Sequence, residues 1–313
     1  MGRKRDKPTQ QPAEEDIESS DASDDSENEI TFNPTTKEER KKQEEQMHEA
    51  NGDEESDEGD EDGDEDMVNV EFEFSDPKEA HFKSVRNFFR YLFLGSAKEI
   101  DFSPLAEAVV GQVEAGSMVQ VSGEDDVYAF LTMLNIQYYK NNQNIKDILS
   151  LLRKNCPDAL KEKFESYLSK QTGLLLNERM RNFPPEVMPH LFESLGEDLK
   201  WALENSDTKE AFRYEYILTI APCFYEKSEK QKKGKKVKLN ESGTCLYFHF
   251  EDEILKRYAE MSFSFDVAQL GDESLSESLH QSRLVMVIPF SKYPQIVKDI
   301  QTLVSEFILY ENA

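Results

Sequence analysis

Cysteine is scarce in this chain of 313 residues, and its scarcity excludes two kinds of covalent or metal scaffold. The three cysteines, Cys156, Cys223 and Cys245, are too few for a disulfide framework and too scattered for a C-x-x-C metal-binding knuckle. The five histidines lie far apart without an H-E-x-x-H pattern, so a zinc site has no support. We therefore expect reduced thiols and no bound metal.

Long apolar runs are also missing. No stretch approaches the roughly 18 apolar residues that a helix needs to cross a bilayer. The amino-terminal segment is polar and charged, unlike the apolar core of a signal peptide. The sequence predicts a soluble, intracellular protein with no membrane partner.

The glycine-rich motifs of nucleotide and acyl chemistry are absent as well. The chain contains no G-x-x-x-x-G-K-[ST], no G-x-G-x-x-G and no G-x-S-x-G. Nucleotide hydrolysis and serine hydrolysis therefore have no support in the sequence. We expect a protein that is not an enzyme, with no catalytic residue and no cofactor.

Negative charge is what the chain has in excess, with a formal net charge of −27. Its densest part reads DEESDEGDEDGDED, with eleven carboxylates in fourteen positions. The members of this acidic run are Asp53, Glu54, Glu55, Asp57, Glu58, Asp60, Glu61, Asp62, Asp64, Glu65 and Asp66. Such a run indicates a cationic partner.

Residues 1–66 hold most of the net charge and few apolar side chains, so they cannot bury enough surface to offset chain entropy. We predict a disordered acidic tail over these residues. Its field would repel DNA, RNA and anionic membranes over the roughly 8 Å that salt leaves unscreened. Basic proteins remain as partners that the acidic run attracts, and a merely solubilising tail is the alternative.

Two basic segments interrupt this acidity. The first is a short cluster at residues 2–7, GRKRDK, which is a weak nuclear import signal. The second is KSEKQKKGKKVK at residues 227–238, which we predict to be an exposed loop between two strands. It has three readings: a nuclear signal centred on Lys232, Lys233, Lys235 and Lys236, an anion-contacting patch, or a solvated hairpin tip.

Residues 67–313 carry the alternating patterns of one folded domain. Period-2 alternation or apolar runs predict strands at 68–74, 117–121, 127–134, 174–180, 211–225, 246–250, 259–265 and 283–289. Apolar residues at three- and four-residue steps predict helices over 82–92, 103–113, 144–152, 158–168, 186–201 and 293–309. Strands 117–121 and 127–134 are close enough to form a hairpin. This order predicts an α/β fold, with a mixed sheet flanked by helices.

The most distinctive segment of the folded part, residues 173–195, reads GLLLNERMRNFPPEVMPHLFESL. Its GLLLNER and NFPP, followed by an apolar helix, resemble the central signature of the BCCIP family of eukaryotic nuclear proteins. The opening strand VNVEF behind an acidic tail, the lysine-rich insertion and the closing RLVMVIP resemble the same family in the same order. The resemblance covers residue 67 to the carboxyl terminus.

This resemblance implies a non-catalytic α/β domain similar in shape to the GCN5-related acetyltransferases. It also implies a chaperone and escort that shuttles between nucleus and cytoplasm and holds a basic large-subunit ribosomal protein, with nuclear transport factors as partners. Family members are linked to DNA repair and cell-cycle proteins too, so an adaptor remains an alternative, as does a degenerate acyltransferase. An acetyltransferase would need an Arg/Gln-x-x-Gly-x-Gly/Ala loop for the cofactor pyrophosphate, and the sequence has none.

Within the signature, most residues have structural explanations. Residues 174–176 fit a core strand, and Pro184-Pro185 fits the entry into a helix. Glu178 and Arg179 are better explained by an ion pair or an exposed strand end than by catalysis. The high net charge favours a monomer.

Overall fold

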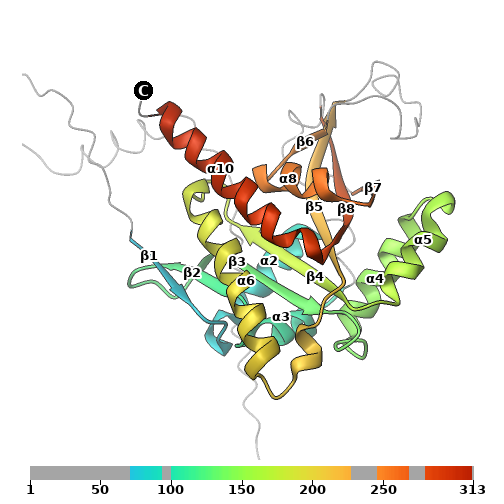
Figure 1. Ribbon diagram of the computed structural model, residues 1–313, viewed down its shortest axis with the longest axis horizontal. Coiled ribbons are helices and arrows are strands. Elements are labelled where there is room, and N and C mark those ends of the chain that lie inside the picture. The colour runs from blue at the N-terminus through green and yellow to red at the C-terminus, as the bar shows by residue number, and fades with distance from the viewer. Residues whose placement is uncertain (1–70, 94–99, 227–244, 268–278, 312–313) are drawn as a thin grey trace, which may run out of the picture. The chain divides into compact units, whose positions relative to one another are not determined.

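The computed structural model describes residues 71–93, 100–226, 245–267 and 279–311 (Figure 1). The tail predicted over 1–66 and the predicted loop at 227–238 lie outside these residues, as does the start of the first predicted strand. The boundary between tail and domain therefore stays a prediction.

One open sheet of eight strands organises the described residues. The strands are β1 Phe72–Ser75, β2 Ser117–Val121, β3 Val127–Asn135, β4 Thr172–Arg179, β5 Tyr216–Glu226, β6 Cys245–Tyr247, β7 Met261–Asp266 and β8 Leu279–Pro289. Seven of them follow the spatial order β1-β2-β3-β4-β5-β8-β7, and β6 pairs with β5 off this path. The predicted mixed sheet is confirmed, since β4 and β5 are parallel while the other pairs are antiparallel.

Helices cover both faces of the sheet. One face carries α2 Phe82–Leu92, α3 Ser103–Val110, α4 Gln143–Asn155 and α5 Asp158–Leu168. The other carries α6 Met188–Asn205, α8 Phe250–Tyr258 and α10 Tyr293–Glu311. In Figure 1, α6 and α10 lie in front of the sheet, and α2 and α3 lie behind it. Short 3-10 turns are η1 Glu79–His81, η3 Pro185–Val187, η4 Lys209–Phe212 and η5 Phe290–Lys292.

Successive side chains of the central strand β4 are buried alternately in the cores on the two faces of the sheet. Leu174 and Leu176 are buried against the α2–α5 side, whereas Leu175 is buried against the α6, α8 and α10 side. Because successive strand residues point to opposite faces, a sheet covered on both sides needs a continuous apolar run. Each fully buried leucine contributes about 1.5–3 kcal/mol relative to exposure. The predicted core role of residues 174–176 is therefore confirmed.

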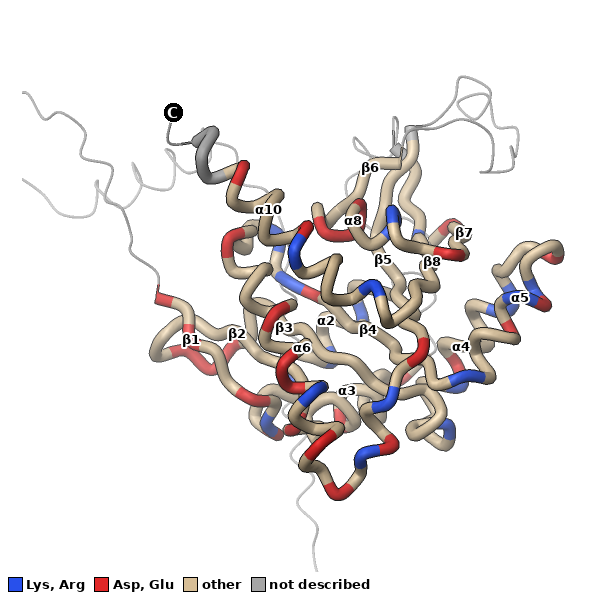
Figure 2. The backbone as a smooth tube through the Cα atoms, viewed as in Figure 1, with Lys and Arg blue, Asp and Glu red and all other residues tan. Residues whose placement is uncertain are grey.

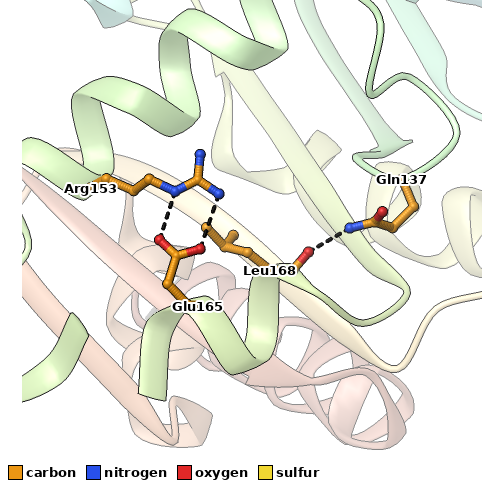
Figure 3. A network of polar contacts seen from close by, with 4 residues as sticks. All are labelled: Gln137, Arg153, Glu165 and Leu168. Carbon is orange, nitrogen blue, oxygen red and sulfur yellow. Dashed lines mark hydrogen bonds and ion pairs between the residues drawn. The ribbon is translucent and has the colours of Figure 1, made fainter. Parts of the chain in front are cut away.

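Helices α4 and α5 form an arm beside the sheet, and the break predicted at Cys156-Pro157 separates them. Helix α4 begins after Asn142, whose side chain accepts a hydrogen bond from the Ile145 N–H. The Arg153 guanidinium on α4 donates two hydrogen bonds, of 2.6 and 3.1 Å, to the Glu165 carboxylate on α5 (Figure 3). Both side chains are about half exposed, so this pair orients the arm but adds little stability.

Two predicted strands are wrong in part. The strand predicted over 211–225 begins only at Tyr216, because Ala211 and Phe212 belong to η4. The strand predicted over 246–250 ends at Tyr247, and Phe250 instead begins α8. The predicted hairpin of 117–121 and 127–134 is confirmed, as β2 and β3 pair antiparallel. Every predicted helix is present, with ends shifted by a few residues.

Candidate functional site

The residues predicted to contact partners are not among those that the structure describes. The acidic run and the four lysines Lys232, Lys233, Lys235 and Lys236 all fall in segments outside the described residues. Only for the lysines does the structure describe the strands on both sides, β5 and β6. Residues 227–244 connect β5 to β6, which pair antiparallel, so the lysine-rich stretch does stand between two strands as predicted.

The described part of the domain has its most unusual chemistry where β4 and β5 separate. The two strands pair in parallel over only four positions, from Thr172 with Tyr216 to Leu175 with Thr219. Beyond them β6 takes over the same edge of β5, pairing with Cys223 to Tyr225. In open α/β sheets, ligands bind outside the carboxyl ends of parallel strands. The point where β4 and β5 diverge is therefore the candidate ligand position of this fold.

The first turn of α8 occupies this divergence. Glu251 accepts a hydrogen bond of 2.7 Å from the Asn177 amide on β4 and forms an ion pair with the Arg179 guanidinium. Both charged side chains are buried, at 8% exposure for Arg179 and 0% for Glu251. The guanidinium also lies 5.5 Å from the centre of the Phe250 ring. The end of β4 is therefore closed by protein side chains.

Burial and neighbouring charges shift the pKa values of the acids and the histidine in this cluster. Burial alone would raise the pKa of Glu251, but the Arg179 charge and the hydrogen bonds hold that pKa below its ordinary value. Burial lowers the pKa of His249 to about 4 and, with the Glu251 charge, raises the pKa of Asp252 well above its usual range. This buried cluster, with the Arg179–Glu251 ion pair at its centre, acts as a structural clamp.

Glu178 lies on the opposite face of the sheet from Arg179. Burial raises the pKa of Glu178 to about 8, although the charges of Arg283 and Arg179 oppose that rise. Arg283 is 1% exposed and donates hydrogen bonds to the backbone oxygens of Leu92 and Tyr91, at the end of α2. Cations stabilise helix carboxyl ends because unpaired carbonyls gather there. Of the ion pair predicted at Glu178 and Arg179, the structure shows one for Arg179, with Glu251, and none for Glu178 among the described residues. Both side chains are buried, so the exposed strand end is excluded.

The start of α6, which follows β4, is poorly suited to hold a phosphate. A phosphate-binding helix offers free backbone N–H groups in its first turn. Here Pro184 and Pro185 precede the helix and Pro189 lies in its first turn, and proline has no N–H. This local structure agrees with the missing pyrophosphate loop in the sequence.

The sequence did not reveal several buried charged residues of the clamp and of the opposite face. Glu251, Asp252 and Arg283 were placed in predicted strands or beside them, with no role assigned. A signal existed for α8, because acidic Glu251–Glu253 and basic Lys256-Arg257 fit the two ends of a helix. Arg283 next to an apolar run carried no comparable signal, since its partners lie on a helix about 190 residues earlier.

Acidic residues also gather on the surface of the described domain. Figure 2 shows them along α6 and around β1 and β2. We call this set the acidic edge: Glu71, Glu73, Asp76, Glu124, Asp125, Asp126, Glu197 and Asp198. Burial raises the pKa of Asp198, and the neighbouring charges of Asp76 and Glu197 raise it further, so these carboxylates are close enough to interact.

Neither a metal site nor a membrane span is found in the described ranges. No group of three or more histidine, cysteine or acidic side chains there has the geometry to hold an ion. No helix within the described residues is both long and apolar enough to cross a bilayer.

The geometry defines a class: an open mixed sheet covered by helices on both faces, closed at its parallel strand ends, with an acidic surface. The model of the BCCIP family matches residues 67–255, and the chain belongs to this family. It is 34% identical to Protein bcp1 of Emericella nidulans, over 68% of this chain and 77% of that relative. It is 28% identical to the Protein BCCIP homolog of Arabidopsis thaliana, over 76% and 75% of the two chains.

A solved relative has the same fold. The crystal structure of BCP1 from Saccharomyces cerevisiae matches 82% of this chain and 98% of its own, with a TM-score of 0.57 at 21% identity. The resemblance to the BCCIP family inferred from residues 173–195 is confirmed by the family model and by the relative that is 34% identical. A diaminobutyrate acetyltransferase from Paenibacillus lautus matches with a TM-score of only 0.31, so the expected likeness to acetyltransferases gains no argument from it.

Proposed function

We propose that this protein is an ATP-independent nuclear chaperone and escort for a basic client, a large-subunit ribosomal protein. The observation that carries the proposal is the acidic run at Asp53–Asp66, eleven carboxylates in fourteen positions. It would cover the lysine and arginine side chains of the client before they meet ribosomal RNA. The proposed mechanism is therefore competition between carboxylates and RNA phosphates for the same cations.

The described domain supports a division of labour within this proposal. Its acidic edge is held by ordered strands and α6, and so presents carboxylates in a set geometry. A set geometry can discriminate between clients, whereas a run of repeated carboxylates raises the encounter rate with any polycation. Specificity would reside in the domain, and affinity and its decline with salt would come largely from the tail.

The closed end of β4 supports a function without catalysis. The position where a ligand would bind beside a parallel strand pair is filled by Glu251 and Arg179, which form an ion pair. Of the two charged residues of the signature, Arg179 is held in an ion pair with Glu251, and Glu178 is buried with a raised pKa. We propose that the domain binds its client and performs no acyl transfer. Acetyl-CoA binding measured by calorimetry would contradict this.

Affinity capture tests the client. Full-length protein and residues 67–313 are used as baits in a eukaryotic lysate at near-physiological salt, followed by mass spectrometry and an RNA assay. One basic large-subunit ribosomal protein recovered by both baits, more weakly by the shorter, and without ribosomal RNA, supports the chaperone. Basic proteins of every kind, all lost with the tail, would contradict it. Partners of ordinary charge would favour the alternative, an adaptor for transport, repair or cell-cycle proteins.

We further propose that the protein shuttles between nucleus and cytoplasm as a monomer, and that the lysine-rich stretch is its nuclear signal. Replacing Lys232, Lys233, Lys235 and Lys236 with glutamine should lower the nuclear fraction of a fluorescent fusion. Replacing the exposed Lys161 and Lys163 of α5 is the matched control, and should leave that fraction unchanged. Equal effects of the two sets would contradict the signal.

A further inference from the structure

Two of the three cysteines meet at the point where the lysine-rich connection leaves the sheet. Cys223 lies on β5 and Cys245 begins β6, and these strands pair antiparallel. The register places Cys223 opposite Tyr247 and Tyr225 opposite Cys245. Residues that face each other across an antiparallel pair project to the same side, so all four side chains share one face and the thiols are diagonal neighbours.

The environments of the two thiols differ. Cys223 is fully buried, with 0% exposure, in the core beneath α8, whereas Cys245 lies at the margin of that core and is partly exposed. Hydrogen bonding from Cys223 lowers the pKa of Cys245 to about 6, helped by Tyr225, Tyr247 and the charge of Lys256. The same bond and burial raise the pKa of Cys223.

We propose that Cys245 and Cys223 form a peroxide-sensitive dithiol, in which Cys245 is oxidised and Cys223 then completes a disulfide. The Cys245 thiolate attacks one oxygen of hydrogen peroxide, the O–O bond breaks, and hydroxide leaves, which yields a sulfenic acid. The Cys223 sulfur then attacks the Cys245 sulfur. The S–O bond breaks, and the Cys223 proton leaves with the hydroxyl as water. Two thiols are oxidised and one peroxide is reduced.

The strand geometry permits this bond with a small movement. Diagonal neighbours in an antiparallel pair sit at or just beyond the Cα separation that a disulfide tolerates, roughly 7 Å. Strand β6 has three residues and, within the described part of the chain, pairs with β5 at one side of the sheet path. A strand with so few ladder bonds can shift toward its neighbour. The disulfide would then hold both ends of residues 227–244 together.

Cys156 provides an internal control. It is buried at the end of α4, in the core on the opposite face of the sheet. Burial raises the pKa of Cys156, so its thiol stays protonated and unreactive at neutral pH. A general sensitivity of the cysteines to oxidation would affect Cys156 too, whereas the proposed dithiol leaves it unchanged.

The test uses full-length protein exposed to hydrogen peroxide at pH 7, with dimedone to trap sulfenic acid and peptide mass spectrometry under non-reducing conditions. We expect a Cys223–Cys245 disulfide, formed at least about tenfold faster than any oxidation of Cys156, since thiolate is the reactive species. The proposal would be overturned if dimedone labelled Cys156 as fast as Cys245. It would also be overturned if Cys156 were oxidised in folded protein while Cys223 and Cys245 stayed reduced.

Two serine variants distinguish the thiol that is oxidised first, Cys245, from the thiol that completes the disulfide, Cys223. Cys223→Ser removes the thiol that completes the bond, so dimedone should accumulate on Cys245. Cys245→Ser should leave Cys223 unlabelled, because Cys223 is buried and protonated. Labelling of Cys223 in that variant would contradict the assignment. Serine in the buried Cys223 position can lower stability, so the wild-type comparison of Cys245 with Cys156 is decisive without either variant.

Discussion

Arg179 at the end of β4 and Glu251 in the first turn of α8 form a buried ion pair across 72 positions of the sequence. The pair joins the one strand that diverges from its parallel partner to the helix that fills the resulting space. A buried charge without its partner is costly, so each residue depends on the other. This relationship explains why the position at which open α/β sheets bind ligands is closed in this fold.

The ion pair leads to a stability prediction. Arg179→Met should lower the free energy of unfolding by about 3–5 kcal/mol, because it leaves the Glu251 carboxylate buried and unpaired. Arg153→Met breaks a half-exposed pair with Glu165 and should cost no more than about 1 kcal/mol. Urea unfolding of both variants measures the difference.

The double variant Arg179→Met, Glu251→Leu is the further control for this pair. It removes both charges and should recover much of the loss, since no lone charge remains buried. Equal destabilisation by Arg179→Met and Arg153→Met would show that burial does not set the energetic cost of breaking the Arg179–Glu251 pair.

Glu178 leads to a prediction about pH. Its pKa is raised from an ordinary 4.5 to about 8, so between these values the folded state binds a proton that the unfolded state has released. Stability therefore falls as pH rises through this window, by the linkage between proton binding and unfolding. Glu178→Gln mimics the protonated carboxyl and should flatten the decline between pH 5 and pH 8.

Denaturant unfolding across this pH range measures the Glu178 effect. The exposed Glu193→Gln on α6 is the control, and should keep the slope of the wild-type protein. A Glu178→Gln variant with the same slope as wild type would mean that Glu178 is already ionised in the folded protein.

Alanine substitutions at two glycines of positive φ would distinguish the cost of backbone strain from the cost of steric crowding. Gly116 has a φ of 122°, and a Cβ there would lie 2.7 Å from Thr132, while Gly123 has a φ of 84° and open space around it. Gly123→Ala should cost about 1 kcal/mol for the left-handed backbone alone. Gly116→Ala should cost a further 1–3 kcal/mol or so, because the added methyl overpacks the β2–β3 hairpin.

Thermal or denaturant unfolding of the two glycine variants measures this difference. Gly116 also donates its N–H to Asp198 on α6, at 3.2 Å, so the larger loss should be accompanied by weaker attachment of that helix. Faster amide exchange over α6 in Gly116→Ala, and not in Gly123→Ala, would report it. Equal losses for both variants would contradict the crowding argument.

The acidic run leads to a prediction about client binding. Replacing its eleven carboxylates with Asn and Gln in the full-length chain should weaken client binding and reduce its salt dependence, while client preference survives. A scrambled order of residues 53–66 keeps the charge and should bind as the wild type does. Titrations of the captured client and of polylysine, at two salt concentrations, measure both effects. Loss of client preference on neutralisation would contradict the assignment of specificity to the domain.

The sequence alone determined the order and type of most elements and the family, because periodicity, prolines and local motifs act over a few residues. The strand predicted over residues 248–250 is wrong, because Leu246, Phe248 and Phe250 alternate as in a strand, whereas α8 already begins at Phe250 and its acidic residues follow. The sequence pattern also extended β5 backward over Ala211 and Phe212, which are apolar but turn in η4.

Only the tertiary structure decided which charges are buried and with whom. Arg179 pairs with Glu251, Arg283 caps α2, and Cys223 meets Cys245 because strand pairing and helix placement bring remote segments together. A strand pattern shows which residues share a face, but it does not specify the neighbouring strand or the helix above it. The physical reason is that local propensity acts along the chain, whereas these contacts depend on the packing of the whole domain.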